Sequence, residues 1–120
     1  MKDITVTLNR NANPPVTCEP QQQNVENGKR HVKWSKGGSD QGFSFFELVI
    51  DDVAINGNFS QIPYYEEEKW VVDDNNSIAH EYFYELKVKA LDGTIYSTKK
   101  KPNKIRGGGG GGGDPSIKNN

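Results

Sequence analysis

Three side chains in this 120-residue chain, Cys18, His31 and His80, could carry nucleophilic or metal chemistry. A catalytic cysteine needs a histidine within reach, and a copper or zinc site needs several such ligands clustered together. His31 falls among basic residues on the polar side of an alternating segment, and His80 stands at the entrance to another. We therefore expect two surface histidines, a cysteine that packs, no catalytic or metal-ligating residue and no cofactor. A ligand-binding, metal-binding or enzymatic loop site around these three residues is the alternative.

Acidic side chains form the second group that could carry chemistry. Glu66, Glu67 and Glu68 are consecutive, and the same part of the chain contains Asp51, Asp52, Asp73 and Asp74. Carboxylates bind divalent cations, but this spacing does not fit the known calcium loop. Consecutive acidic residues also point in different directions along a strand or turn. We therefore expect a solvated acidic edge rather than a metal site.

A basic segment near the C-terminus is the nearest approach to a nucleic-acid footprint. Clustered cations on an arm attract phosphates. The net charge of the chain is only −1, however, and no aromatic residue interrupts this segment. Lysines also protect edge strands against unwanted pairing. Nucleic-acid binding is therefore an alternative and not the main expectation; the residues concerned are Lys99, Lys100, Lys101, Lys104 and Arg106.

The length of the chain favours one domain with one core. Every aromatic residue precedes residue 103, so the body of the chain can form that core while the C-terminal tail cannot. No apolar run is long enough to span a membrane, and the chain begins without an apolar leader. The lone Cys18 fits a reducing compartment. We expect a cytoplasmic protein with no membrane partner.

The elements that must position any site are strands. The clearest signal is a β-hairpin over residues 81–99, closed by Asp92 and Gly93, in which apolar residues alternate with polar ones. Its predicted inward residues are Tyr82, Tyr84, Leu86, Val88 and Ala90.

Further short strands precede this hairpin, with turn signals between most of them. Residues 43–50 are the most apolar, and their alternation shifts between Phe45 and Phe46, which suits either a β-bulge or a strand covered on both faces. We expect this segment to be a central strand. Residues 20–27 and 73–77 read as loops. The pattern predicts an all-β chain, a single antiparallel sandwich of seven or eight strands. The other expected strands are 4–8, 16–19, 29–35, 53–55 and 69–72, with residues 59–62 as a continuation of 53–55.

Two residues narrow this fold class further. Trp34 lies in an early strand, and Tyr84 stands two residues before the apolar Leu86 in the penultimate strand. This arrangement resembles the immunoglobulin-like superfold. Leu86 stands where antibody-type domains have a cysteine, so the resemblance is to disulfide-free relatives such as fibronectin type III modules. It implies a fold and no particular function.

We expect a sandwich domain over residues 1–103 and a tail over residues 104–120. The tail holds seven glycines, which read as a flexible linker, and then a peptide around Ile117 that could add a strand to its own sheet or to that of a neighbouring copy. Acidic and basic residues are sorted into separate blocks. We therefore expect a non-enzymatic interaction or structural module with a protein partner, or a homo-oligomer. Besides the basic segment, the candidate interaction residues are Tyr64, Tyr65, Glu66, Glu67, Glu68, Trp70, Asp114, Pro115 and Ile117.

Overall fold

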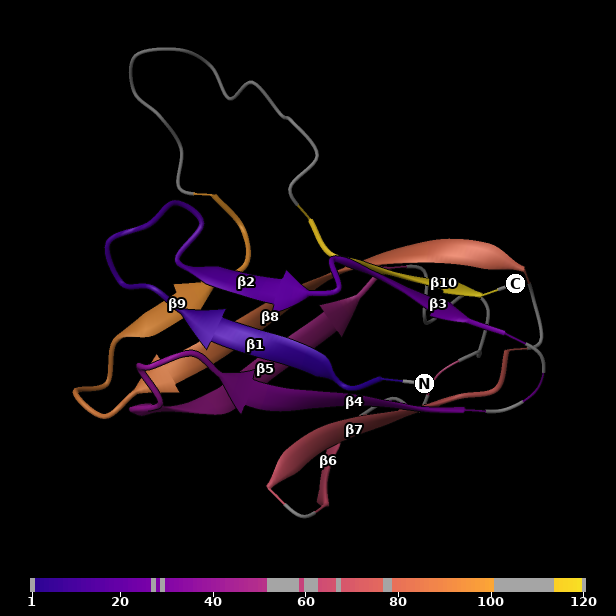
Figure 1. The fold of residues 1–120 in the computed structure, drawn as a ribbon, viewed down its shortest axis with the longest axis horizontal. Helices are drawn as coiled ribbons and strands as arrows, with labels where there is room; N and C mark the ends of the chain where they lie inside the picture. Colours follow the sequence, from indigo (N-terminus) through magenta and orange to yellow (C-terminus); the bar gives the residue numbers. More distant parts are fainter. Residues whose placement is uncertain are drawn as a thin grey trace, which may run out of the picture.

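The computed structural model describes residues 2–26, 28, 30–51, 59, 63–66, 68–76, 79–100 and 114–119, which form ten strands in two sheets (Figure 1). The first sheet has the order β2 (Val16–Glu19), β1 (Ile4–Leu8), β4 (Arg30–Gly37), β7 (Lys69–Asp74), β6 (Tyr64–Glu66). The second has the order β3 (Gln22–Val25), β10 (Ser116–Asn119), β8 (His80–Ala90), β5 (Phe43–Ile50), and β9 (Ile95–Ser97) also pairs with β8.

The prediction of an all-β fold is confirmed for these residues. Both sheets are mixed, however, because β1 pairs with β4 in parallel and β3 pairs with β10 in parallel. The strand number also exceeds the predicted seven or eight. The parallel β1–β4 pair explains one glycine: a Cβ at Gly37 would lie 2.1 Å from a methyl carbon of Thr5, so only glycine fits there.

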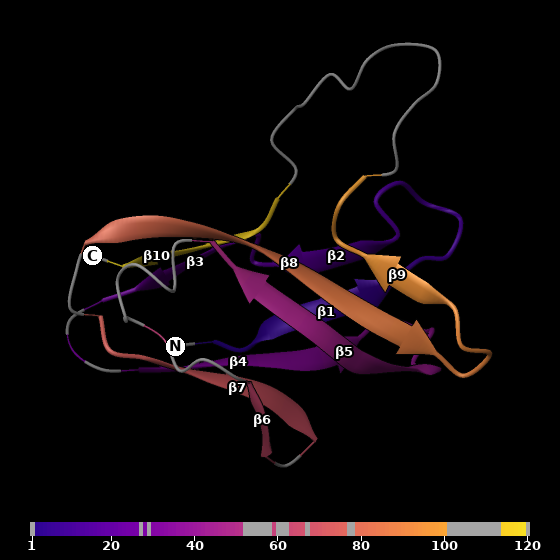
Figure 2. The ribbon, with the colours of Figure 1, turned by 180° about the vertical axis from the view of Figure 1, so that it is seen from behind.

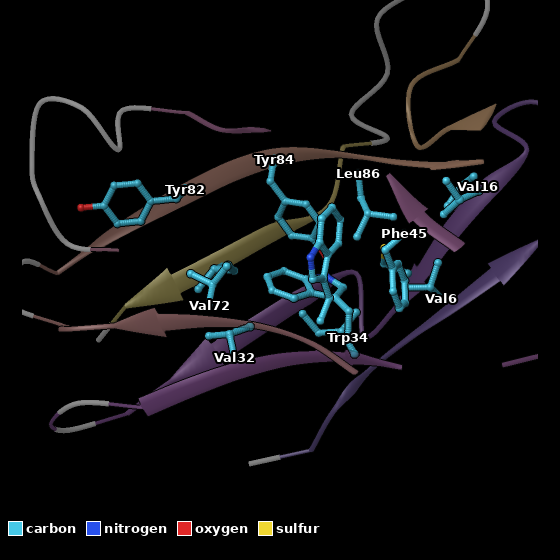
Figure 3. Packing of buried hydrophobic residues seen from close by; sticks show 14 of the residues in the cluster. Val6, Val16, Val32, Trp34, Phe45, Val72, Tyr82, Tyr84 and Leu86 are labelled. Carbon is cyan, nitrogen blue, oxygen red and sulfur yellow. The ribbon is translucent and has the colours of Figure 1, made fainter. Parts of the chain in front are cut away.

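The core lies between the two sheets and follows the predicted alternation. All five predicted inward residues of the hairpin strand β8 are buried. Trp34 of the first sheet meets Tyr84 of the second, with ring centroids 5.5 Å apart and nearly perpendicular planes (Figure 3). The Trp34 indole nitrogen donates a hydrogen bond of 3.1 Å to the Tyr84 hydroxyl. This pair joins the layers through both apolar contact and a satisfied polar group.

The most apolar strand, β5, is not central. It lies at the end of the second sheet, which leaves Phe46 and Val49 exposed. The predicted bulge is confirmed between Phe45 and Glu47. The prediction of a central strand is therefore wrong, because the bulge accounts for the shifted alternation without a second covering layer.

Two strands fall where no strand was expected. The predicted loop 20–27 contains β3, which turns only Gln23 and Val25 inward. β6 ends at Glu66, the first of the three consecutive glutamates. Both are too polar or too short to give a periodic signal. The strand segments predicted at 53–55 and 59–62 lie outside the described residues, except for Phe59, which is buried and forms a bridge with Asp74.

β7 continues to Asp74, into the segment predicted to be a loop. Asp73 faces outward and is half-exposed, whereas Asp74 is 1% exposed. Successive side chains of a strand point to opposite faces, so two neighbouring carboxylates have opposite environments. The prediction of a solvated acidic edge is therefore wrong for Asp74.

Candidate functional site

One edge of β8 is shared by two strands that are distant in sequence. β9 pairs with the segment around Val88, and β10 pairs with the segment around Tyr82; both run antiparallel to β8 (Figure 2). The Thr98 amide donates to the Leu86 carbonyl, and the Pro115 carbonyl accepts from the Tyr84 amide. The chain therefore leaves β8 at Leu86 and returns to it at Tyr84. These two residues of β8 are about 7 Å apart.

β10 is not an added edge strand, because it lies between β8 and β3. Its register places Ile117 opposite Tyr82 on one side and opposite Gln23 on the other. The Ser116 amide donates to the Gln21 carbonyl at 2.8 Å. Within the described part of the chain, β10 is the only ladder partner of β3. We call the space between β3 and β8, filled by residues 115–119, the β10 slot.

The side chains of β10 are largely buried in this slot. Ile117 is 0% exposed and belongs to the hydrophobic core. Pro115, Ser116 and Asn119 are also buried, and only Lys118 is exposed. The last strand of the chain is therefore an integral part of the second sheet.

Glu81 holds the three strands of the slot together. Its Oε2 atom accepts a hydrogen bond of 2.6 Å from the Ser116 hydroxyl and one of 2.9 Å from the Gln22 side-chain nitrogen, Nε2. These two donors lower the pKa of Glu81, because they stabilise the carboxylate form. One side chain of β8 thus bonds to both β10 and β3.

Asp74 connects the end of β10 to the first sheet. Its Oδ1 atom accepts from the Asn119 side-chain nitrogen at 3.0 Å and from the Asn76 backbone amide at 2.8 Å. Burial raises the pKa of Asp74, because the carboxylate loses its hydration. The slot is thus closed at one end by a carboxylate from the opposite layer.

A second candidate surface, here called the aromatic edge, consists of Phe45, Tyr65 and Trp70. The three rings form a cluster: the Trp70 centroid lies 5.4 Å from that of Phe45 and 6.3 Å from that of Tyr65, and the Phe45 and Tyr65 centroids are 6.4 Å apart. The Tyr65 hydroxyl donates to the Phe45 carbonyl at 3.2 Å. A cleft of about 500 Å³ opens beside Phe45 and Tyr65, with Lys36, Glu68 and Lys69 among its lining residues. Of the three rings of this edge, Phe45 and Trp70 are buried and Tyr65 is exposed.

The predicted interaction residues do not form one surface. Tyr64, Tyr65, Glu68 and Trp70 lie on the β6–β7 hairpin at the end of the first sheet. Pro115 and Ile117 lie inside the second sheet, Asp114 precedes them, and Lys99 and Lys100 are exposed after β9. The side chains of Glu66 and Glu67 and all of Lys101, Lys104 and Arg106 lie outside the described residues, as do the glycines, so the predicted boundary at residue 103 stays a prediction.

The residues first considered for chemistry are scattered. The His31 side chain is 65% exposed and contacts Asp73 at 2.7 Å. His80 is exposed beside the Tyr82 ring. Cys18 is buried, and burial raises its pKa to about 12, which leaves the thiol protonated and unreactive. The predictions of surface histidines and of a packing cysteine are confirmed.

The described residues hold no group of three or more His, Cys, Asp or Glu side chains placed to bind a metal ion. Nor do they include a helix long and apolar enough to cross a membrane.

Sequence reasoning missed most of the polar residues of the slot. The sequence pattern predicts Glu81 only as the first residue of the hairpin and places Gln22 in a loop. The single apolar residue Ile117 is the one sequence signal for β10, and one residue is too little to specify a partner strand. No protein-family model matches this chain, and no curated protein matches its sequence. A function must therefore be proposed from the chemistry of its own surfaces.

Proposed function

We propose that this protein is a non-enzymatic interaction module that self-associates by exchanging β10 between copies. The observation that carries the proposal is the two-sided pairing of β10 in a slot that begins two residues from the point where β9 leaves β8. In the exchanged form, β10 of one copy fills the slot of another. Every contact of the slot is kept, so exchange costs no native contacts.

The length of the connection supports exchange. A gap of about 7 Å needs only two or three extended residues. Residues 99–114, which join Thr98 to Pro115, number sixteen and can reach about 55 Å when extended. Each doubling of loop length costs about 0.6 kcal/mol, so this surplus weakens docking within one copy by about 2 kcal/mol. It also gives β10 the reach to enter a second copy.

An empty slot would destabilise the folded protein, so a strand must occupy it. Loss of β10 would uncover the core at Ile117 and leave backbone groups of β3 and β8 without their ladder partners. A tethered strand has an effective concentration in the millimolar range. We therefore expect the closed monomer in dilute solution and exchanged dimers as the protein concentration approaches that range.

We also propose that the two packed sheets have an immunoglobulin-like arrangement of the disulfide-free kind. Support comes from the Trp34–Tyr84 contact, which joins the two residues that carry the resemblance, and from the single free cysteine. A fold of this kind hosts many unrelated functions, so the proposed self-association rests on β10 and not on the fold.

Native mass spectrometry of mixed isotopic copies would test the exchange. Unlabelled and ¹⁵N-labelled full-length chains are incubated together at about 1 mM and then diluted. We expect dimers of mixed mass, and we expect an excess of the peptide of residues 114–120 to suppress them by occupying the slot. Absence of mixed dimers at this concentration would contradict the proposal.

A shortened chain supplies the matched control. Deleting residues 101–112 leaves four residues between Thr98 and Pro115, enough to fill the chain's own slot but with a reach of only about 17 Å. We expect this variant to stay monomeric with unchanged stability or higher. Equal dimerisation of the shortened chain would show that another surface associates.

A further inference from the structure

Three side chains at the ends of β7 and β10 form a group that we call the polar box: Asp74, Asn76 and Asn119. Asp74 and Asn119 are each 1% exposed. Four buried atoms of this group have no hydrogen-bond partner in the described part of the chain: Asp74 Oδ2, both Asn76 side-chain atoms and Asn119 Oδ1. Buried polar atoms without a partner are rare in folded proteins, and each lowers the free energy of unfolding unless a water molecule or an ion binds it.

The Asn119 side chain and the Asn76 backbone meet at the Asp74 carboxylate. Asp74 Oδ1 already binds the Asn119 side-chain nitrogen and the Asn76 backbone amide. Asn119 Oδ1 shares a carbon with that nitrogen, and Asp74 Oδ2 shares a carbon with Oδ1. Two unpartnered oxygens, Asp74 Oδ2 and Asn119 Oδ1, therefore lie at the same place, and a third, Asn76 Oδ1, belongs to the residue whose backbone amide binds Asp74. A proton on Asp74 would join only two of these oxygens through one hydrogen bond, whereas one cation can bind all three.

We propose that the polar box is a calcium site that joins β10 to β7. Carboxylate and amide oxygens are the ligands that hard cations prefer, and calcium tolerates irregular sets of them. Asp74 and Asn76 also have the Asp-x-Asn spacing with which calcium loops begin. Asn76 has a φ of 49°, and its backbone amide folds back onto Asp74. Asn119 adds an oxygen from the opposite sheet.

The surrounding charges limit the affinity. The box holds one carboxylate, and the register partners of its strands are basic: Arg30 lies opposite Asp74, and His80 lies opposite Asn119. Both basic residues are exposed. We therefore expect a dissociation constant in the weak range of about 0.1–1 mM.

Calcium in this box would act on the proposed strand exchange, and only this consequence rests on the proposed function. Asn119 must leave the box before β10 can leave its slot. A bound ion therefore slows exchange between copies, while an exchanged β10 rebuilds the same site in its new partner. The site itself requires only that β10 is docked.

Calcium titration of the full-length chain would test the site. The protein is freed of metal with a chelator and titrated with CaCl₂ to 10 mM, using NaCl at equal ionic strength as reference. We expect saturable shifts of the Asp74, Asn76 and Asn119 amide signals and a rise in Tm of about 5 °C at tenfold excess over the dissociation constant. Asp74→Asn removes the response, while Asp73→Asn, a change of the neighbouring outward carboxylate, retains it.

Either of two results would overturn the site: no saturable shift up to 10 mM, or an equal response in Asp74→Asn. An equal response to MgCl₂ would overturn the assignment to calcium. The isotopic mixing experiment is then repeated with and without CaCl₂, and the ion is expected to slow the appearance of mixed dimers at least tenfold. Binding without any exchange would reject strand exchange alone; exchange without binding would reject the calcium site alone.

Discussion

The β10 slot and the aromatic edge both contain residues that were predicted to contact a partner, yet the two regions differ in how deeply those residues are buried. The slot holds a single large apolar residue, Ile117, which is fully buried. The aromatic edge holds three aromatic residues, and one of them, Tyr65, is 57% exposed. The difference follows from position within a sheet, because β10 is paired on both sides while β6 lies at a sheet end. Pairing, more than composition, decides how deeply a short segment is buried.

The largest expected effect tests the depth of the slot. Ile117→Ala removes fully buried methyl and methylene groups and leaves a cavity, so we expect the free energy of unfolding to fall by about 3 kcal/mol. Urea unfolding measures this change. Lys118→Ala, in the same strand but exposed, should change the stability by less than about 0.5 kcal/mol. Similar losses in the two variants would show that β10 is not held by its buried face.

An intermediate effect concerns the polar end of the slot. The folded pKa of Asp74 is raised, so its protonated form favours folding. Its contribution is fully present below the unfolded pKa of about 3.9 and is lost as the pH rises through the folded value. With a chelator present, wild type should therefore lose stability relative to Asp74→Asn as the pH rises from 4 to 7.

Thermal unfolding of both proteins across this pH range measures the difference. The carboxyls with lowered pKa values, Asp40, Asp73, Glu81 and Asp92, contribute in the opposite direction but are common to both proteins. A constant difference between wild type and variant would mean that Asp74 has the same pKa folded and unfolded.

The smallest effect is expected at the aromatic edge. Tyr65→Phe removes the hydrogen bond to the Phe45 carbonyl and keeps the ring stacked on Trp70. Because Tyr65 is half in water, we expect a loss of about 0.5 kcal/mol in the same urea assay. A loss near that of Ile117→Ala would remove the contrast between the two regions.

The predictable part of this fold is the part with a local period. The alternation in β1, β4 and β8 identified their buried faces, including Trp34 and Tyr84. β3 and β6 gave no such signal, because a short polar strand gains its stability from neighbours that the local pattern does not name.

The candidate site was predictable only in part, for a related reason. The tail peptide could be suspected as an added strand because Ile117 is its one large apolar residue. Its insertion between β3 and β8, and the use of Glu81 and Asp74 from two different sheets, depend on contacts across 35 and 45 residues of sequence. No local pattern encodes such distances.

The sequence alone determined that the chain is built of strands, which of their faces point inward, and that a glycine-rich segment separates the last peptide from the rest. Only the tertiary structure decided which strands pair, that two pairs run parallel, and that neighbouring Asp73 and Asp74 have opposite environments. The physical reason is that the inward face of a strand follows from its own alternation. Its partner, and the burial of its polar ends, follow from the other strands that compete for the same edge.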